Sequence, residues 1–197
     1  MISPERIESQ KAALRREMAR RCGGVAAAEA GAAGRSMAEL LGVSADWLAG
    51  SRIGLFAGLP GEPDTRPLFE MLLGAGKEAF MPRCLAGGRM EMARAGGWEE
   101  LAPGRFDILE PPEHAVRCSM YSLDLLLIPG VAFDARGGRL GRGGGFYDRA
   151  LAGGEPGPRR LGVAFAFQVV ERVPTADHDR RVDGLLTECD LVTAVQP

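Results

Sequence analysis

Short apolar runs separated by glycine and proline, with helical segments between them, occupy the chain from Arg52 onward. Strands buried on both faces of a parallel or mixed sheet give such runs. The longest, over residues 123–133, is interrupted by polar and turn-forming residues and cannot span a membrane, which takes about 20 apolar residues. We therefore predict one domain, residues 1–197, with a three-layer, doubly wound α/β fold and a mostly parallel sheet. Ligands of such sheets bind beyond the carboxyl ends of the strands, where residues 58–64 and 129–145 would lie.

The N-terminal part of the chain is predicted to form two helices. Ser3 followed by Pro4 marks the start of the first, because a serine oxygen can accept an orphan amide and proline suits the first helical position. This helix should end at Cys22. The second, over Val25–Leu41, contains two glycines that each cost about 1 kcal/mol relative to alanine. Further predictions are a crossover helix over Thr65–Leu73, a helix start within Gly143–Leu151, a loop over Gly153–Pro158, and strands over Ile53–Ala57, Glu78–Met81, Met90–Ala93, Asp124–Ile128, Leu161–Ala164 and near Leu185–Thr187.

Charge and cysteine spacing exclude several classes of partner. The formal net charge is −2, whereas proteins that bind the phosphate backbone of nucleic acids normally carry a basic excess. The four cysteines form no C-x-x-C pair, which argues against a zinc site and against a disulfide framework. Met1–Arg21 is charged and lacks the apolar centre of a secretory signal. We expect a cytoplasmic monomer that acts on small molecules, with no nucleic-acid or membrane partner.

A glycine-rich segment follows the predicted strand that ends at Ile128. Its three consecutive glycines, Gly143–Gly145, let the backbone approach a ligand closely and point several amides at one place, which suits a phosphate. Arg139 and Arg142 can add forked donors to phosphate oxygens. The segment lacks the Lys-Ser/Thr ending of a P-loop, and Phe146 stands where a dinucleotide fingerprint needs a third small residue. On residue chemistry alone, a flexible surface loop remains the alternative.

The same segment carries a family resemblance. Pro129–Asp134 followed by Arg139–Asp148 resembles the signature of 5-formyltetrahydrofolate cyclo-ligases, also called methenyltetrahydrofolate synthetases. The resemblance implies a fold related to those of sugar-phosphate isomerases and CoA transferases. It is weak over Gly23–Gly50 and Arg94–Met120. Other similar motifs occur in the expected order at Lys11-x-x-x-Arg15, Gly61–Thr65, Met81–Arg83, Met90–Met92 and His178–Asp183.

The family's reaction converts 5-formyltetrahydrofolate and ATP to 5,10-methenyltetrahydrofolate, ADP and phosphate, with magnesium. The resemblance implies that the formyl oxygen attacks the γ-phosphate, and that a neighbouring folate nitrogen closes on the phosphorylated imine before phosphate leaves. Phosphoryl transfer needs mainly positioning and charge neutralisation. A chain with two histidines and no recognisable nucleophilic triad agrees with this chemistry.

The resemblance also implies roles for individual residues. Asp148 and Asp183 match the magnesium-associated acids, and oxygen ligands shared with phosphate are those that magnesium prefers. Glu62 matches the acid that holds the pterin, because a carboxylate can accept hydrogen bonds from the N–H groups of the pterin. Arg142 and Tyr147 are the implied catalytic residues. The implied ATP contacts are Lys11, Arg15, Arg139, Leu140, Gly141, Arg142, Gly143, Gly144, Gly145, Phe146 and Tyr147, and the implied folate contacts are Ala57, Glu62, Arg142, Gly143, Gly144, Gly145 and Phe146.

The clearest departure from the family pattern is Phe146, where many relatives have tyrosine. The ring is kept and the hydroxyl is lost. We interpret the position as one that serves by packing an aromatic face, since Tyr147 still supplies a hydroxyl.

Two other functions remain open from the sequence. A sugar-phosphate isomerase or CoA-transferase-like enzyme would need a poised acid or base and no ATP. A non-catalytic folate or nucleotide binding protein would bind both ligands without turnover, and fold alone cannot separate these cases. His178–Asp179 is interpreted as a loop contact, because no second histidine follows nearby.

Overall fold

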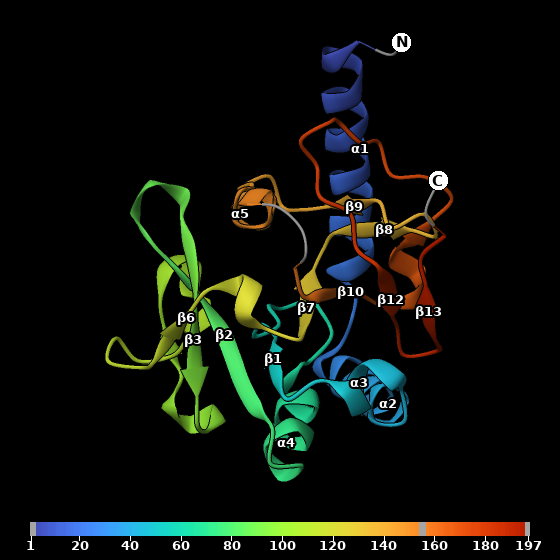
Figure 1. Cartoon of the computed structure of the whole chain (residues 1–197). Coiled ribbons are helices and arrows are strands. Elements are labelled where there is room, and N and C mark those ends of the chain that lie inside the picture. Colours follow the sequence, from blue (N-terminus) through green and yellow to red (C-terminus); the bar gives the residue numbers. More distant parts are fainter. Residues whose placement is uncertain (1–2, 154–156, 196–197) are drawn as a thin grey trace.

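The computed structural model describes residues 3–153 and 157–195, and its regular elements are arranged around one large sheet (Figure 1). The helices are α1 (Pro4–Cys22), α2 (Ala27–Gly42), α3 (Ala45–Ala49), α4 (Arg66–Gly74) and α5 (Phe146–Ala150). The strands are β1 (Arg52–Gly54), β2 (Glu78–Cys84), β3 (Met90–Ala95), β4 (Ala102–Pro103), β5 (Leu109–Glu110), β6 (Arg117–Cys118), β7 (Leu125–Pro129), β8 (Ala132–Asp134), β9 (Arg139–Leu140), β10 (Arg159–Val163), β11 (Val169–Val170), β12 (Gly184–Leu186) and β13 (Leu191–Thr193).

The large sheet has the strand order β13-β12-β10-β7-β1-β2-β3-β6. Its five central strands, from β12 to β2, pair in parallel, and β13 and β3 add antiparallel pairs at the two edges. In the centre, Ile53 of β1 lies opposite Leu125 of β7 and Ala79 of β2. The chain moves from β1 to β2 on one side and from β7 to β10 on the other. The predicted α/β fold with a mostly parallel sheet is thus confirmed.

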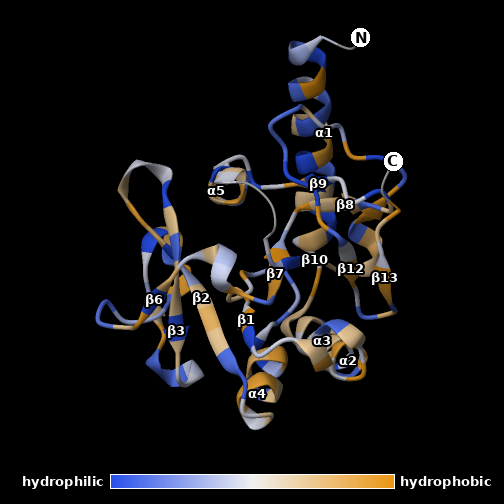
Figure 2. Cartoon of the chain, in the orientation of Figure 1, coloured by the Kyte–Doolittle hydropathy of each residue, from blue (hydrophilic) through white to orange (hydrophobic). Residues whose placement is uncertain are grey.

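Two hydrophobic layers cover the two faces of this sheet. Successive side chains of a strand point to opposite faces, so Leu125 and Leu127 pack with residues of α2 and α4, whereas Leu126 and Ile128 pack with Phe133 of β8. In Figure 2, β2 and β7 are drawn mostly in hydrophobic colours, while α1 alternates between hydrophobic and hydrophilic stretches. Among the described residues, no helix is long and apolar enough to cross a membrane.

The first helix packs on a second, three-stranded sheet of order β11-β8-β9. Its start is as predicted, since the Ser3 side chain accepts a hydrogen bond from the Arg6 N–H at 3.3 Å. Met18, which is 2% exposed, packs against Ala132 of β8 and Leu140 of β9. This contact places the polar face of α1 beside the glycine-rich segment, which begins in β9.

The predicted strands and longer helices are all present, with ends shifted by a few residues. Gly34 was predicted only to weaken its helix, but in the structure it is needed for packing. A Cβ built on Gly34 would lie 1.9 Å from the carbonyl oxygen of Asp64, so α2 and the loop after β1 can touch only through a glycine. In the predicted loop over Gly153–Pro158, residues 154–156 lie outside the described part of the chain.

Candidate active site

A cavity of about 880 Å³ lies beyond the carboxyl ends of β1, β2 and β7. This is the point where the strand order reverses, because successive crossovers from β1 and from β7 go to opposite sides. Ligands of open α/β sheets bind at such switch points. The segments predicted to lie at this edge, 58–64 and 129–145, both contribute to the lining.

The loop between β1 and α4 forms one wall of the cavity and holds Glu62 in place. Thr65 is fully buried, and its hydroxyl donates to the Phe56 carbonyl and accepts from the Gly58 N–H at 3.2 Å. Within the loop, Glu62 Oε2 accepts from the Leu59 N–H at 3.0 Å. The loop therefore fixes the carboxylate before any ligand binds.

An ion pair joins this wall to the glycine-rich segment. Glu62 Oε1 accepts from both Nε and Nη2 of Arg142, at 3.0 and 2.7 Å. The Glu62 side chain is 9% exposed, whereas the Arg142 side chain is 59% exposed. The predicted pterin acid and a predicted catalytic arginine are thus in direct contact, although they are 80 residues apart in sequence.

The glycine-rich segment forms a tight turn between β9 and α5. Gly143 has φ +100° and Gly145 has φ +65°, values that residues with a side chain rarely adopt. Arg149 fastens the turn, since its Nη2 donates to the carbonyls of Gly144 at 2.6 Å and of Gly88, in the turn after β2, at 2.9 Å. The turn is therefore held between α5 and the β2–β3 hairpin.

Two cations of α1 face the same cavity. Lys11 is 4% exposed, and its Nζ lies 2.7 Å from Asp179 Oδ2 and 3.4 Å from Glu8 Oε1. Arg15 Nε donates to the Gly141 carbonyl at 2.9 Å. Burial alone would raise the pKa of Asp179, but the hydrogen bonds from Lys11 and from a backbone N–H outweigh it and hold that pKa below its usual value. Asp179 is thus a charged loop contact of Lys11.

Arg139 and Asp148 form a second, partly buried ion pair across the glycine-rich segment. Arg139 Nη2 lies 2.6 Å from Asp148 Oδ1, and the Arg139 guanidinium also lies over the ring of Tyr147, 5.7 Å from its centroid. Burial raises the pKa of Tyr147 well above its usual range. At neutral pH the phenol therefore stays protonated and can act as a hydrogen-bond donor.

The structure does not bring Asp183 to the cavity. Its carboxylate accepts from the backbone N–H of Arg160 at 2.8 Å and from the guanidinium of Arg160 at 3.1 Å. Asp183 directly precedes β12, and Arg160 lies in the neighbouring strand β10. The acid of this segment that lines the cavity is Asp179. The role of Asp183 beside Asp148 in a magnesium site stays a prediction.

An aromatic pair lies at one side of the cavity. The rings of Phe106 and Phe146 are 6.0 Å apart at 80°, an edge-to-face arrangement. Phe106 is 61% exposed and has φ +62°, and Asp107 follows with φ +58°. Residues with side chains adopt such values at a cost of order 1–3 kcal/mol. No motif points to Phe106, which lies in a stretch where the family resemblance is weak.

The cavity brings together the predicted site residues except Asp183. Those that line it are Lys11, Arg15, Ala57, Glu62, Arg139, Leu140, Gly141, Arg142, Gly143, Gly144, Gly145, Phe146, Tyr147 and Asp148. Lining residues that sequence reasoning did not assign include Phe106, Arg149, Asp179 and Arg180.

Comparisons with known proteins agree with this arrangement. Residues 7–188 match the model of the 5-formyltetrahydrofolate cyclo-ligase family. The 5-formyltetrahydrofolate cyclo-ligase of Mus musculus is 31% identical over 92% of this chain and 95% of its own length, and that of Escherichia coli K12 is 36% identical over 68% and 76%. The solved 5,10-methenyltetrahydrofolate synthetase of Aquifex aeolicus is 30% identical and superposes with a TM-score of 0.79 over 95% of this chain and 94% of its own. The synthetase of Mycoplasma pneumoniae, 19% identical, has the same fold with a TM-score of 0.72 over 90% and 98%.

Proposed function

Because the chain belongs to the 5-formyltetrahydrofolate cyclo-ligase family, we propose that the cavity beyond β1, β2 and β7 is where 5-formyltetrahydrofolate and ATP meet. The activity of the chain is the ATP-dependent closure of 5-formyltetrahydrofolate to 5,10-methenyltetrahydrofolate, with release of ADP and phosphate. The observation that carries the proposal is that one cavity is lined by two chemically different sets of residues. Lys11, Arg15 and the glycine-rich turn supply positive charge and backbone amides, and Glu62 with apolar neighbours supplies a carboxylate in an apolar wall.

ATP phosphates belong beside Lys11 and Arg15. Lys11 and Arg15 are already positioned by Asp179 and by the Gly141 carbonyl, so little side-chain freedom is lost when they bind an anion. The glycine-rich turn lines the same cavity, so its backbone amides are available as further donors to phosphate oxygens. Positioned positive charge is the main requirement for phosphoryl transfer.

Folate belongs beside Glu62, whose carboxylate accepts hydrogen bonds from N–H groups of the pterin. Arg142 contacts Glu62 and belongs to the glycine-rich turn, so it links the two substrates. We assign Arg142 the role of neutralising charge on the transferring phosphoryl group. Tyr147 acts as a neutral hydrogen-bond donor, because its raised pKa excludes a phenolate base at neutral pH.

Magnesium would be held by Asp148 together with phosphate oxygens. Among the described residues, no three histidine, cysteine or acidic side chains converge into a ready-made metal site. Magnesium fits this setting, because it is usually bound by one or two carboxylates and by substrate phosphates. Bound there, it would neutralise phosphate charge. The Arg139 guanidinium and the Arg180 N–H, which both donate to Asp148 Oδ1, orient this carboxylate.

The direct test is incubation of the purified chain with 5-formyltetrahydrofolate, ATP and magnesium, followed by the near-ultraviolet absorbance of the methenyl product. We expect an absorbance rise that requires ATP and that stops when magnesium is chelated. Folded protein that gives no ATP-dependent rise would overturn the proposal. Size-exclusion chromatography of the same sample tests the further proposal that the chain is a monomer, and we propose the cytoplasm as its compartment.

Replacing Glu62 with glutamine should weaken folate binding and spare ATP binding. The change keeps the size of the side chain but replaces one acceptor oxygen with a donor, and losing one charge-assisted hydrogen bond should cost about 1.5–3 kcal/mol. We expect the KM for 5-formyltetrahydrofolate to rise at least tenfold and the KM for ATP to stay within twofold. Asp64→Asn is the matched control, since Asp64 lies in the same loop but caps α4 through the Arg66 N–H. Equal effects of both variants on folate would refute the assignment.

Phe146→Tyr and Phe146→Ala should separate packing from hydrogen bonding. The Phe146 ring contacts the Phe106 ring edge-to-face and lies under the Arg149 guanidinium, at 5.4 Å. Restoring a hydroxyl should change kcat/KM by less than about tenfold, or 1.4 kcal/mol. Removing the ring should lower kcat/KM for folate, with a loss of transition-state stabilisation of about 2–3 kcal/mol. Steady-state kinetics decide the matter, and a large gain in Phe146→Tyr would show that a missing hydroxyl limits the enzyme.

A further inference from the structure

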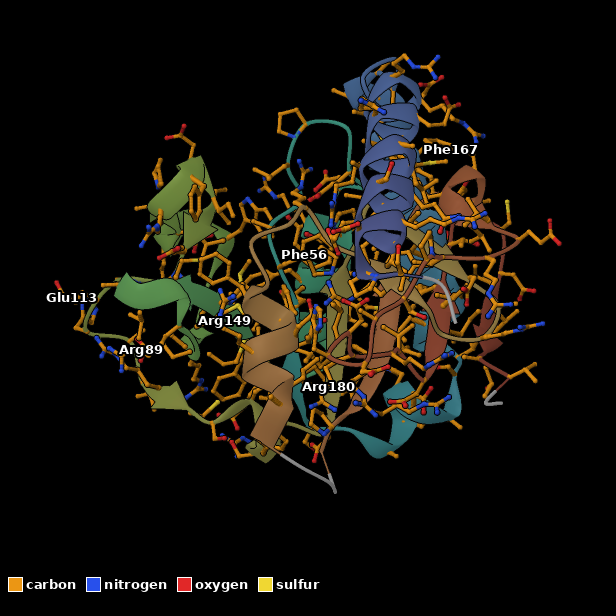
Figure 3. All side chains as sticks on the ribbon, turned by 90° about the horizontal axis from the view of Figure 1, so that it is seen from above. Phe56, Arg89, Glu113, Arg149, Phe167 and Arg180 are labelled. Atoms are coloured by element: carbon orange, nitrogen blue, oxygen red, sulfur yellow. The ribbon has the colours of Figure 1, made fainter. Side chains whose placement is uncertain are left out.

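Arg180 lies at the phosphate end of the cavity, between two residues that the proposed function already uses. Its backbone N–H donates to Asp148 Oδ1 at 3.1 Å, and the preceding residue, Asp179, holds Lys11. The side chain is half-buried and lines the cavity. In the view from above, Arg149 and Arg180 lie on opposite sides of α5 (Figure 3). The position of Arg180 is thus fixed by its own backbone contact.

The guanidinium of Arg180 differs from the other cations of the cavity. Its Nε is buried, and among the described residues it has no hydrogen-bond acceptor. A buried polar group without a partner destabilises the fold, so a structural role for this side chain is unfavourable. The other cavity cations each have an acceptor: Asp179 for Lys11, Gly141 for Arg15, Asp148 for Arg139, Glu62 for Arg142, and Gly88 and Gly144 for Arg149.

A second unpartnered nitrogen belongs to the arginine that shares Asp148 with Arg180. Arg139 donates to Asp148 Oδ1 through Nη2, but its buried Nε also has no acceptor among the described residues. One carboxylate oxygen thus anchors two arginines, one by its side chain and one by its backbone. Both residues line the cavity, and the further N–H donors of their guanidinium groups match an anion with several oxygens.

The charge of the residues around Arg180 also favours an anion. Four cations, Lys11, Arg15, Arg139 and Arg180, face three carboxylates, those of Glu8, Asp148 and Asp179. Each carboxylate is engaged by Lys11 or Arg139, which leaves Arg15 and Arg180 without an ion-pair partner among the described residues. Of these two, Arg15 donates to the Gly141 carbonyl. A polyphosphate carries the charge and the oxygen acceptors that this arrangement lacks.

We infer that Arg180 is an additional phosphate-binding residue, and that its forked donors contact the polyphosphate of ATP beside Arg139. This inference rests on the proposed function, because it takes ATP as the anion. It gives the 178–180 segment two separate tasks. Asp179 positions Lys11, and Arg180 contacts the phosphates directly.

The test compares Arg180→Gln with Arg181→Gln in the full-length chain. Arg181 is the adjacent arginine, does not line the cavity, and donates to the Arg136 carbonyl at 2.8 Å. ATP, inorganic tripolyphosphate and 5-formyltetrahydrofolate are each titrated calorimetrically into both variants and the wild type at fixed magnesium. We expect Arg180→Gln to bind ATP and tripolyphosphate at least tenfold more weakly and folate within twofold of wild type. Arg181→Gln should bind all three within twofold.

The Tm of thermal unfolding without ligand separates a phosphate-binding arginine from a structural one. Because Arg180 lacks an acceptor on the protein, its replacement should not lower the Tm, whereas loss of a structural arginine would. If Arg180→Gln does not fold, Arg180→Lys keeps the charge without the fork and should bind both phosphate ligands at least threefold more weakly.

ATP and tripolyphosphate affinities within twofold of wild type in Arg180→Gln would overturn the inference. A loss confined to folate, or a lower Tm with equal loss of every ligand, would also overturn it. Failure of the proposed function gives a different result, because wild-type protein would then bind tripolyphosphate with the same dependence on Arg180 but form no methenyl product. Wild-type protein that binds neither phosphate ligand would reject both.

Discussion

Gly143→Val is expected to abolish turnover and to leave the fold intact. Gly143 has φ +100°, and a β-branched residue is especially disfavoured there. The strain, of order 1–3 kcal/mol or more, would be relieved by rearranging the turn that carries Arg142 and the amides proposed to contact the phosphates. Misplacing such donors by about 1 Å can cost on the order of a hundredfold. We therefore expect kcat/KM to fall at least hundredfold in steady-state assays, with an unchanged circular-dichroism spectrum.

Two other glycines serve as controls for this prediction. The φ of Gly144 is not positive, and a Cβ there would meet only the Phe146 ring, at 3.0 Å, so Gly144→Ala should retain activity within tenfold. Gly76 has φ +71° but follows α4, away from the cavity, with open space around it. Gly76→Ala should lower the Tm and spare turnover. Near-normal activity of Gly143→Val would remove the turn from the active site.

Lys11→Met is expected to lose both ATP affinity and stability. The Lys11 and Asp179 side chains are 5% and 12% exposed, and removing one partner of a buried ion pair typically costs about 3–5 kcal/mol. ATP affinity should fall at least tenfold, because the lost Nζ is a proposed phosphate contact. Adding Asp179→Asn removes the unpaired carboxylate, so the double variant should recover stability but not ATP affinity. Recovery of both would show that Lys11 acts only through Asp179.

The stability effect of Lys11→Met should depend on pH in a defined direction. The folded-state pKa of Asp179 is lowered, so in wild type its contribution is fully present above the unfolded-state pKa, about 3.9, and is lost as pH falls through the folded-state value. In Lys11→Met, burial without the lysine should raise that pKa instead. The stability difference between the proteins should therefore be largest near pH 7 and shrink below about pH 4. Urea unfolding at several pH values measures it, and a difference that grows in acid would contradict the assignment.

Local chemistry made some elements predictable and left others hidden. The Ser3–Pro4 start of α1 and the unbroken apolar run of β7 are signals within a few residues of chain. Strands as short as β6 or β9 have two residues and exist only because a partner strand is nearby. No periodicity can show such a strand in the sequence.

In the site too, residues within the family motifs could be predicted, whereas residues placed by contacts between distant segments could not. The glycine-rich signature, Lys11, Arg15 and Glu62 were found because the family resemblance extends to them, and the cavity brings them together. The sequence did not predict that Asp179 would line the cavity while Asp183 pairs with Arg160, an arginine in the strand beside β12. The sequence of that segment contains both acids and does not show which one such an arginine will engage.

The attachment of α1 has a consequence for how the enzyme is made. Arg15 and the carbonyl that it contacts, that of Gly141, are 126 positions apart, and Asp179, the partner of Lys11, is later still. Contacts this distant in sequence form slowly, because a long loop must close first. During synthesis the first helix therefore leaves the ribosome long before the segments that fix its cations exist. The contacts of Lys11 and Arg15 therefore form late, so a partly made chain can fold much of its sheet before the cations of the cavity are positioned.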